Sequence, residues 1–181
     1  MPTCTRCGRG NPEGFRFCGN CAAPLIAEDG PHRETRKTVT VVFCDVTGST
    51  ALGEQLDPET LRRVMARYFE AMATVLERHG GTVEKFIGDA VMAVFGIPTV
   101  HEDDALRAVR AADEMGHALA TLNDDLHSEW GVRLAMRIGV NTGEVVTGQG
   151  SGQGSGGQRL VTGDAVNVAA RLEQAASPAR S

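Results

Sequence analysis

The hydrophobic and polar positions of the chain change their spacing along its length, and this spacing predicts strands and helices in turn. Runs rich in β-branched and other apolar residues predict strands at residues 38–44, 82–86, 90–95, 133–140, 144–147 and 160–162. The polar triplet 141–143 predicts a turn. Five glycines among residues 149–158 predict a flexible loop before the last run.

Apolar residues at helical spacing predict three helices. Asp57 and Pro58 supply an N-cap and a first turn for the first helix, which Gly80 ends. Its apolar positions are Leu61, Met65, Tyr68, Met72, Val75 and Leu76. The second helix covers residues 103–122, and its apolar face is expected to hold Leu106, Val109, Met115, Leu119 and Leu122. The third helix begins at Asp164 or Val166 and reaches about Ala176.

The predicted order of elements is βαββαββα. This order indicates an α+β fold, with an antiparallel-leaning sheet and helices over one of its faces. Residues 46–50 are small and are expected to form a loop after the first strand.

The first part of the chain has a different character, because its cysteines replace an apolar core. Cys4, Cys7, Cys18 and Cys21 have the spacing C-x2-C-x10-C-x2-C, which is typical of a closed structural zinc site. Two disulfides or an unstructured tail are the alternatives. The segment is similar to the short zinc ribbons of bacterial multidomain proteins, and it could dock a protein partner. The chain therefore divides into a zinc ribbon at residues 1–26, a polar linker at 27–37 and a larger domain at 38–181.

Composition and charge narrow the function. Hydrophobic residues make up 41% of the 181 residues and aromatic residues only 4%, so the core is expected to be mainly aliphatic. A net charge of -5 provides no basic field for a nucleic-acid backbone. The sequence shows no secretory signal and no apolar run near the roughly 20 residues needed to span a bilayer. We therefore expect a cytoplasmic protein with no nucleic-acid or membrane partner.

Two aspartates are the candidate metal ligands. Asp45 lies where a predicted buried strand meets a Gly/Ser/Thr loop, and Asp89 lies in the predicted strand connection after Gly88. Two carboxylates beside phosphate-binding amides suit Mg²⁺ or Mn²⁺. Either aspartate alone could equally be a turn residue.

Four stretches of sequence, in order, resemble the class III adenylyl/guanylyl cyclase catalytic domain. They are VFCDVTGST at residues 42–50, KFIGD at 85–89, MRIGVNTG at 136–143 and VTGDAVNVAARL at 161–172. The resemblance covers roughly residues 38–176. It implies a ferredoxin-like palm fold and a head-to-tail homodimer that converts ATP to cyclic AMP and pyrophosphate.

The resemblance also implies a role for each matching residue. Asp45, Asp89 and the Val46 carbonyl would bind two Mg²⁺ or Mn²⁺ ions. The triphosphate would be held by Gly48, Ser49, Thr50 and Arg137. Lys85 would contact adenine, Asn167 would orient the ribose, and Arg171 would stabilise charge on the reacting phosphate. Asp45 and Asp89 would come from one subunit, and Lys85, Asn167 and Arg171 from the other.

The sequence departs from the family at two places. Leu160 stands where the family usually has an Asp or Thr that recognises the base, although Lys85 still favours ATP. The chain also ends at Ser181, before the final strands and their phosphate-binding lysine, so we expect a C-terminally incomplete fold, a fragment or truncated product, and reduced activity. Other interpretations are a guanylyl cyclase, a silent cyclase-like module for dimerisation or nucleotide sensing, and, more distantly, a polymerase-like palm.

Overall fold

The structure is a computed structural model that describes residues 3–25, except 5, 13, 16 and 24, and residues 35–178, except 150–158. The chain forms two compact units, Met1–Glu34 and Thr35–Ser181. Most of the predicted linker, and the glycine-rich loop from residue 150 onward, lie outside the described residues. The last three residues assigned to the linker, 35–37, instead begin the first strand.

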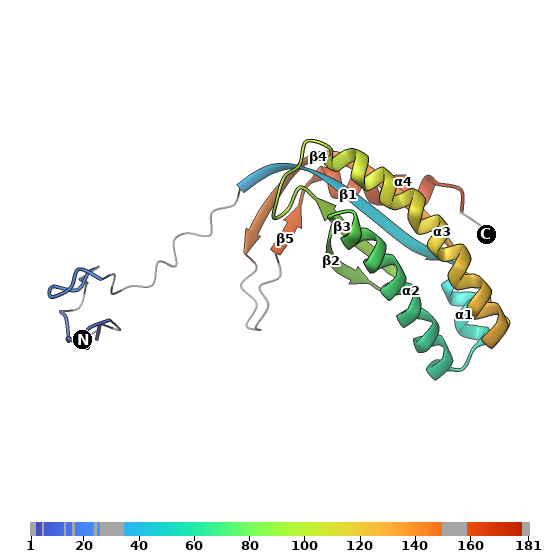
Figure 1. Cartoon of the computed structure of the whole chain (residues 1–181), viewed down its shortest axis with the longest axis horizontal. Coiled ribbons are helices and arrows are strands. Elements are labelled where there is room, and N and C mark those ends of the chain that lie inside the picture. The colour runs from blue at the N-terminus through green and yellow to red at the C-terminus, as the bar shows by residue number, and fades with distance from the viewer. Residues whose placement is uncertain are drawn as a thin grey trace. The chain divides into compact units, whose positions relative to one another are not determined.

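The described residues of the second unit form nine helices and strands (Figure 1). In chain order they are β1 (Thr35–Thr47), α1 (Ser49–Gln55), α2 (Pro58–Arg78), β2 (Thr82–Ile87), β3 (Ala90–Phe95), α3 (Asp104–Trp130), β4 (Ala135–Gln149), β5 (Arg159–Thr162) and α4 (Asp164–Ala175). Helix α1 replaces part of the loop predicted at residues 46–50. Among the helices described, none is both long and apolar enough to cross a membrane.

The strands form one antiparallel sheet in the order β2-β3-β1-β4-β5. The long strand β4 corrects the prediction of a turn at residues 141–143, since it pairs with β1 without interruption from Thr147 to Ala135. Contacts with α4 explain the turn-like residues Asn141 and Gly143 in this strand. Asn141 donates a hydrogen bond from Nδ2 to the carbonyl oxygen of Ala165 (3.1 Å), and a Cβ on Gly143 would lie only 2.9 Å from the Ala165 Cβ.

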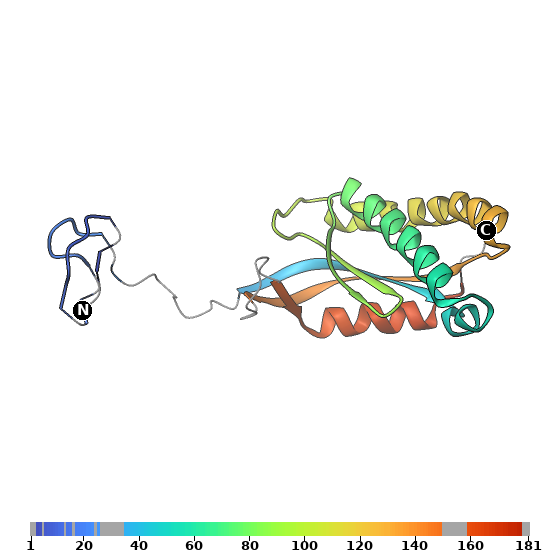
Figure 2. The ribbon, with the colours of Figure 1, turned by 90° about the horizontal axis from the view of Figure 1, so that it is seen from below.

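Helices cover both faces of the sheet, not one face as predicted. Figure 2 shows α2 and α3 on one side and α4 on the other. Alternate residues of β1 contribute to two separate cores. Val42, Cys44 and Val46 belong to the α2/α3 core, whereas Val39 and Val41 belong to the α4 core.

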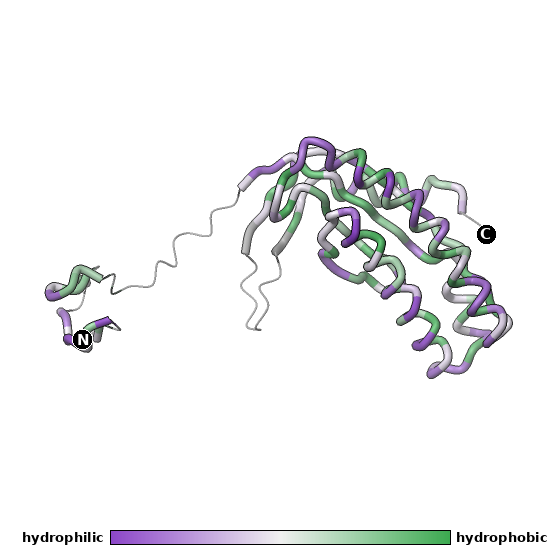
Figure 3. The backbone as a smooth tube through the Cα atoms, viewed as in Figure 1, coloured by the Kyte–Doolittle hydropathy of each residue, from purple (hydrophilic) through white to green (hydrophobic). Residues whose placement is uncertain are grey.

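Helix α3 extends to Trp130, beyond the predicted end at residue 122. Leu106 and Val109 are 48% and 55% exposed, which corrects their prediction as core residues. The buried stripe instead starts on two alanines and continues through larger side chains: Ala108, Ala111, Met115, Leu119, Leu122 and Leu126. Figure 3 shows hydrophobic and hydrophilic positions alternating along α2 and α3, as expected for helices with one buried face.

Candidate active site

Asp45 lies near the end of β1 on the sheet face that α4 covers. Its partners in the ladder are Ala90 on β3 and Arg137 on β4. Asp89 precedes Ala90 in the tight β2–β3 turn, where Gly88 has the left-handed φ of 63°. The antiparallel register thereby brings two carboxylates and one guanidinium to the same end of the sheet.

Asp89 is close enough to Asp45 to change the acidity of Asp45. Burial, then the negative charge of Asp89 and hydrogen bonding with it, raise the pKa of Asp45 to about 6. Glu173 on α4 contributes a smaller increase in the same direction. Two like charges in a partly buried place are costly unless a cation neutralises them.

The donor set fits a hard divalent cation. Within the described part of the chain, the buried Oδ1 of Asp45 has no hydrogen-bond partner. An oxygen in this condition, beside a second carboxylate, is suited to metal coordination. Val46, whose carbonyl is the third expected ligand, follows directly and is 3% exposed.

Glu173 is a site residue that the sequence reasoning missed. Helix α4 lies so close to β4 that a Cβ on Gly139 would overlap the Ala169 carbonyl oxygen and the Glu173 amide nitrogen. Glu173 is therefore 5% exposed, one helical turn after Ala169 on the buried face of α4. An acidic residue in line with buried alanines was the available signal.

The other predicted phosphate contacts lie after β1. Gly48 has the left-handed φ of 76°, and Ser49 and Thr50 open α1 directly after it. Because the N-cap residue of α1 is Gly48, no side chain at that position caps the helix.

Lys85 lies on edge strand β2, half-buried, opposite Met92 of β3. Met92 packs in the core on the α4 side, so Lys85 is on the same sheet face as Asp45. Two strand spacings separate β2 from β1, which is about 10 Å. Lys85 is not among the main groups that shift the pKa of Asp45.

Asn167 and Arg171 are both exposed on α4. They are one turn apart and lie on the side opposite the buried residues Ala169 and Glu173. The structure therefore does not bring them to the aspartate pair of their own chain. Leu160 pairs through its backbone with Gly148, and its side chain lies outside the described residues.

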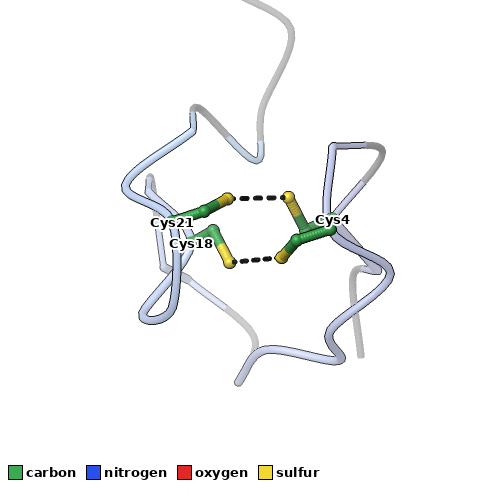
Figure 4. A group of neighbouring side chains, drawn as sticks. Cys4, Cys18 and Cys21 are labelled. Carbon is green, nitrogen blue, oxygen red and sulfur yellow. Dashed lines mark hydrogen bonds between the residues drawn. The ribbon is translucent and has the colours of Figure 1, made fainter.

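The first unit gathers its four cysteines into one group (Figure 4). All four sulfur atoms lie within 4.8 Å of one another. The Cys4–Cys21 and Cys7–Cys18 sulfur pairs are each 3.6 Å apart, and the cysteines are free thiols. Four sulfurs at about 2.3 Å from one tetrahedral ion would be separated by about 3.8 Å. The cluster therefore fits a metal ion.

Comparison with known proteins identifies the larger unit. A family model described as the adenylate and guanylate cyclase catalytic domain matches residues 32–180. The chain belongs to this family. The α+β palm fold with its antiparallel sheet, described above, matches solved cyclase structures. The predicted fold class is therefore confirmed.

The similar proteins include cyclases of both substrate types. An adenylate cyclase of Anabaena cylindrica is 33% identical over 167 residues, which are 87% of this chain and 32% of that protein. The solved guanylyl cyclase Cya2 is 39% identical with a TM-score of 0.74, covering 80% of this chain and 73% of that one. The solved adenylyl cyclase CyaB from P. aeruginosa is 33% identical with a TM-score of 0.75, covering 80% and 74%. The chain thus spans about a third of the length of this Anabaena relative.

Proposed function

We propose that this cyclase domain is an adenylyl cyclase that converts ATP to cyclic AMP and pyrophosphate. The observation that carries the proposal is the pair Asp45 and Asp89. Burial and the charge of Asp89 raise the pKa of Asp45, and the buried Oδ1 of Asp45 lacks a hydrogen-bond partner in the described residues. A cation-binding pair of this kind is what cyclisation of a nucleoside triphosphate requires.

The reaction joins the ribose 3′-oxygen to the α-phosphorus and expels pyrophosphate. Divalent cations, when bound, would neutralise the triphosphate and lower the pKa of the 3′-hydroxyl. Asp45, Asp89 and the Val46 carbonyl would hold these cations. Arg137, directly across the ladder from Asp45, would bind phosphate oxygens through its planar and permanently charged guanidinium.

A second copy of the chain would complete the site. Asn167 would orient the ribose, because an amide can both donate and accept hydrogen bonds. Arg171 would stabilise charge on the reacting phosphate. The exposed position of both residues, on the side of α4 away from the sheet, supports their action on the partner subunit's aspartates.

Lys85 supports ATP as the substrate, because its ammonium can donate a hydrogen bond to the ring nitrogen N1 of adenine. The corresponding N1 of guanine carries a proton and cannot accept this bond. GTP is the second candidate, supported by the similarity to a guanylyl cyclase and by the apolar Leu160. A catalytically silent module is less well supported, because both aspartates, Asn167 and Arg171 are present.

For the first unit, we propose one structural Zn²⁺ held by the four cysteines. Closed four-sulfur coordination leaves no position for catalysis. The exposed aromatic side chains Phe15 and Phe17, at 50% and 57%, are consistent with a role in binding a protein partner.

Product analysis by chromatography tests the enzymatic proposal. The full chain is incubated separately with ATP and GTP in the presence of Mn²⁺, alongside Asp45→Ala. We expect cyclic AMP from the wild type and none from the variant. Cyclic GMP from GTP, with no cyclic AMP from ATP, would reverse the substrate assignment, and no cyclic product from either nucleotide would reject the enzyme.

A further inference from the structure

Glu173 is a buried acid that the proposed reaction does not yet use. It is 5% exposed, and its Cα would lie 3.0 Å from a Cβ on Gly139. Since glycine occupies that position, the helix can place Glu173 directly on the sheet surface. Gly139 and Arg137 point to the same face of β4, because alternate residues of a strand share a face. Glu173 thus lies beside the row that contains Arg137 and Asp45.

The charges around Glu173 come from the active site. Burial raises the pKa of Glu173, the guanidinium of Arg137 lowers it, and the negative charge of Asp89 raises it. Glu173 in turn contributes to the raised pKa of Asp45. Glu173 can act on Arg137 and on the aspartates without touching them, because charges interact over several ångströms in a partly buried site.

Arg137 creates a problem for a cation site. It stands directly across the ladder from Asp45, and its buried Nε has no hydrogen-bond partner among the described residues. Its fixed positive charge therefore repels any cation that Asp45 and Asp89 attract. The negative charge of Glu173, which acts on both Arg137 and the aspartate pair, reduces that repulsion.

We propose that Glu173 is a positioning residue whose carboxylate offsets the charge of Arg137, so that Asp45 and Asp89 can bind divalent cations. The inference rests on the proposed metal site. It predicts that Glu173 affects metal binding through charge alone. A glutamine, which has the same shape, should remove this effect while keeping the packing of α4.

Mn²⁺ binding to the full chain, without nucleotide, measures the effect directly. The signal of free Mn²⁺ in electron paramagnetic resonance is followed after zinc saturation, so that the cysteine cluster takes up no manganese. Glu173→Gln should weaken Mn²⁺ binding on the order of tenfold. The matched control Glu77→Gln removes an exposed glutamate from α2, on the other side of the sheet, and should bind Mn²⁺ as the wild type does.

Arg137→Met tests whether Glu173 acts through Arg137. This variant alone should tighten Mn²⁺ binding, and the double variant with Glu173→Gln should return close to the wild type. Unchanged binding in Glu173→Gln, or a double variant as weak as Glu173→Gln alone, would overturn the inference. Asp45→Ala tests the metal site itself, separately from the role of Glu173. If this variant binds Mn²⁺ as the wild type does, the proposed metal site is wrong.

Thermal unfolding followed by circular dichroism shows whether Glu173→Gln is folded as the wild type is. Since burial and Asp89 both disfavour the ionised form of Glu173, the metal-free Glu173→Gln variant should be at least as resistant to thermal unfolding as the wild type. A lower midpoint combined with weaker Mn²⁺ binding would indicate a structural role and count against the proposal.

Discussion

Replacing Gly139 with alanine tests the packing that places Glu173 at the site. The added Cβ would overlap the backbone of Ala169 and lie 3.0 Å from the Glu173 Cα. Carbon atoms pack best at about 3.5–4.0 Å, so α4 would have to move away by about 1 Å. The obstructing atoms are mainly backbone, and no side-chain rotation can relieve the overlap. Overpacking of this kind should cost about 3 kcal/mol of the free energy of unfolding.

Urea unfolding followed by the fluorescence of the single tryptophan measures this cost. Gly116→Ala is the matched control, because a Cβ there meets no atom within 4 Å and the residue lies inside helix α3. That variant should stabilise the protein by about 0.5–1 kcal/mol, the helical preference of alanine over glycine. A Gly139→Ala variant as stable as the wild type would refute the close approach of α4 to β4.

Three further predictions concern acidity, metal and a buried hydrogen bond. The pKa of Asp45 is about 6 in the folded protein and about 4 in the unfolded chain, so ionisation of Asp45 destabilises the fold as the pH rises through this range. Without divalent metal, Asp45→Asn should therefore be about 1 kcal/mol more stable than the wild type at pH 8 and equally stable near pH 4, as measured by urea unfolding. A gain that is equal at both pH values would contradict this. Elemental analysis should find one zinc per chain, lost in Cys18→Ser but kept in Cys44→Ala, whose thiol is buried in the other unit; zinc retained by Cys18→Ser would reject the cluster. Asn123 bonds both the amide and the carbonyl of Leu134 at 2.7 and 2.8 Å, so Asn123→Ala should cost about 2–3 kcal/mol in the same unfolding assay, and a cost below about 0.5 kcal/mol would show that these bonds do not matter.

Two short strands could be predicted closely from the sequence. Strands β2 and β3 match their apolar runs closely, because β-branched and aromatic residues in short runs have few other stable arrangements. Strand β4 was divided wrongly at residues 141–143. There the residue types serve the contact with α4, through the bond from Asn141 and the space left by Gly143, and local turn statistics do not include such a tertiary contact.

The candidate site was partly visible in the sequence. The resemblance named Asp45, Asp89 and Arg137, and the antiparallel register explains why residues so far apart in the chain lie together. Glu173 could not be found in this way, because its burial depends on how closely α4 packs against Gly139. The placement of helices on both faces of the sheet was also not predicted, because the apolar face of a helix does not reveal which face of the sheet it covers.

The central claim is a cyclase whose active site is shared between two chains, and mixing two inactive variants tests it most directly. Asp89→Ala removes a metal ligand and Asn167→Ala removes the proposed ribose contact, each from a different half of the site. Mixed chains can form one intact site, so the account predicts that cyclic AMP production, absent from each variant alone, returns to a fraction of the wild-type rate on mixing. Two variants that stay inactive when mixed, while the wild type is active, would contradict the shared site.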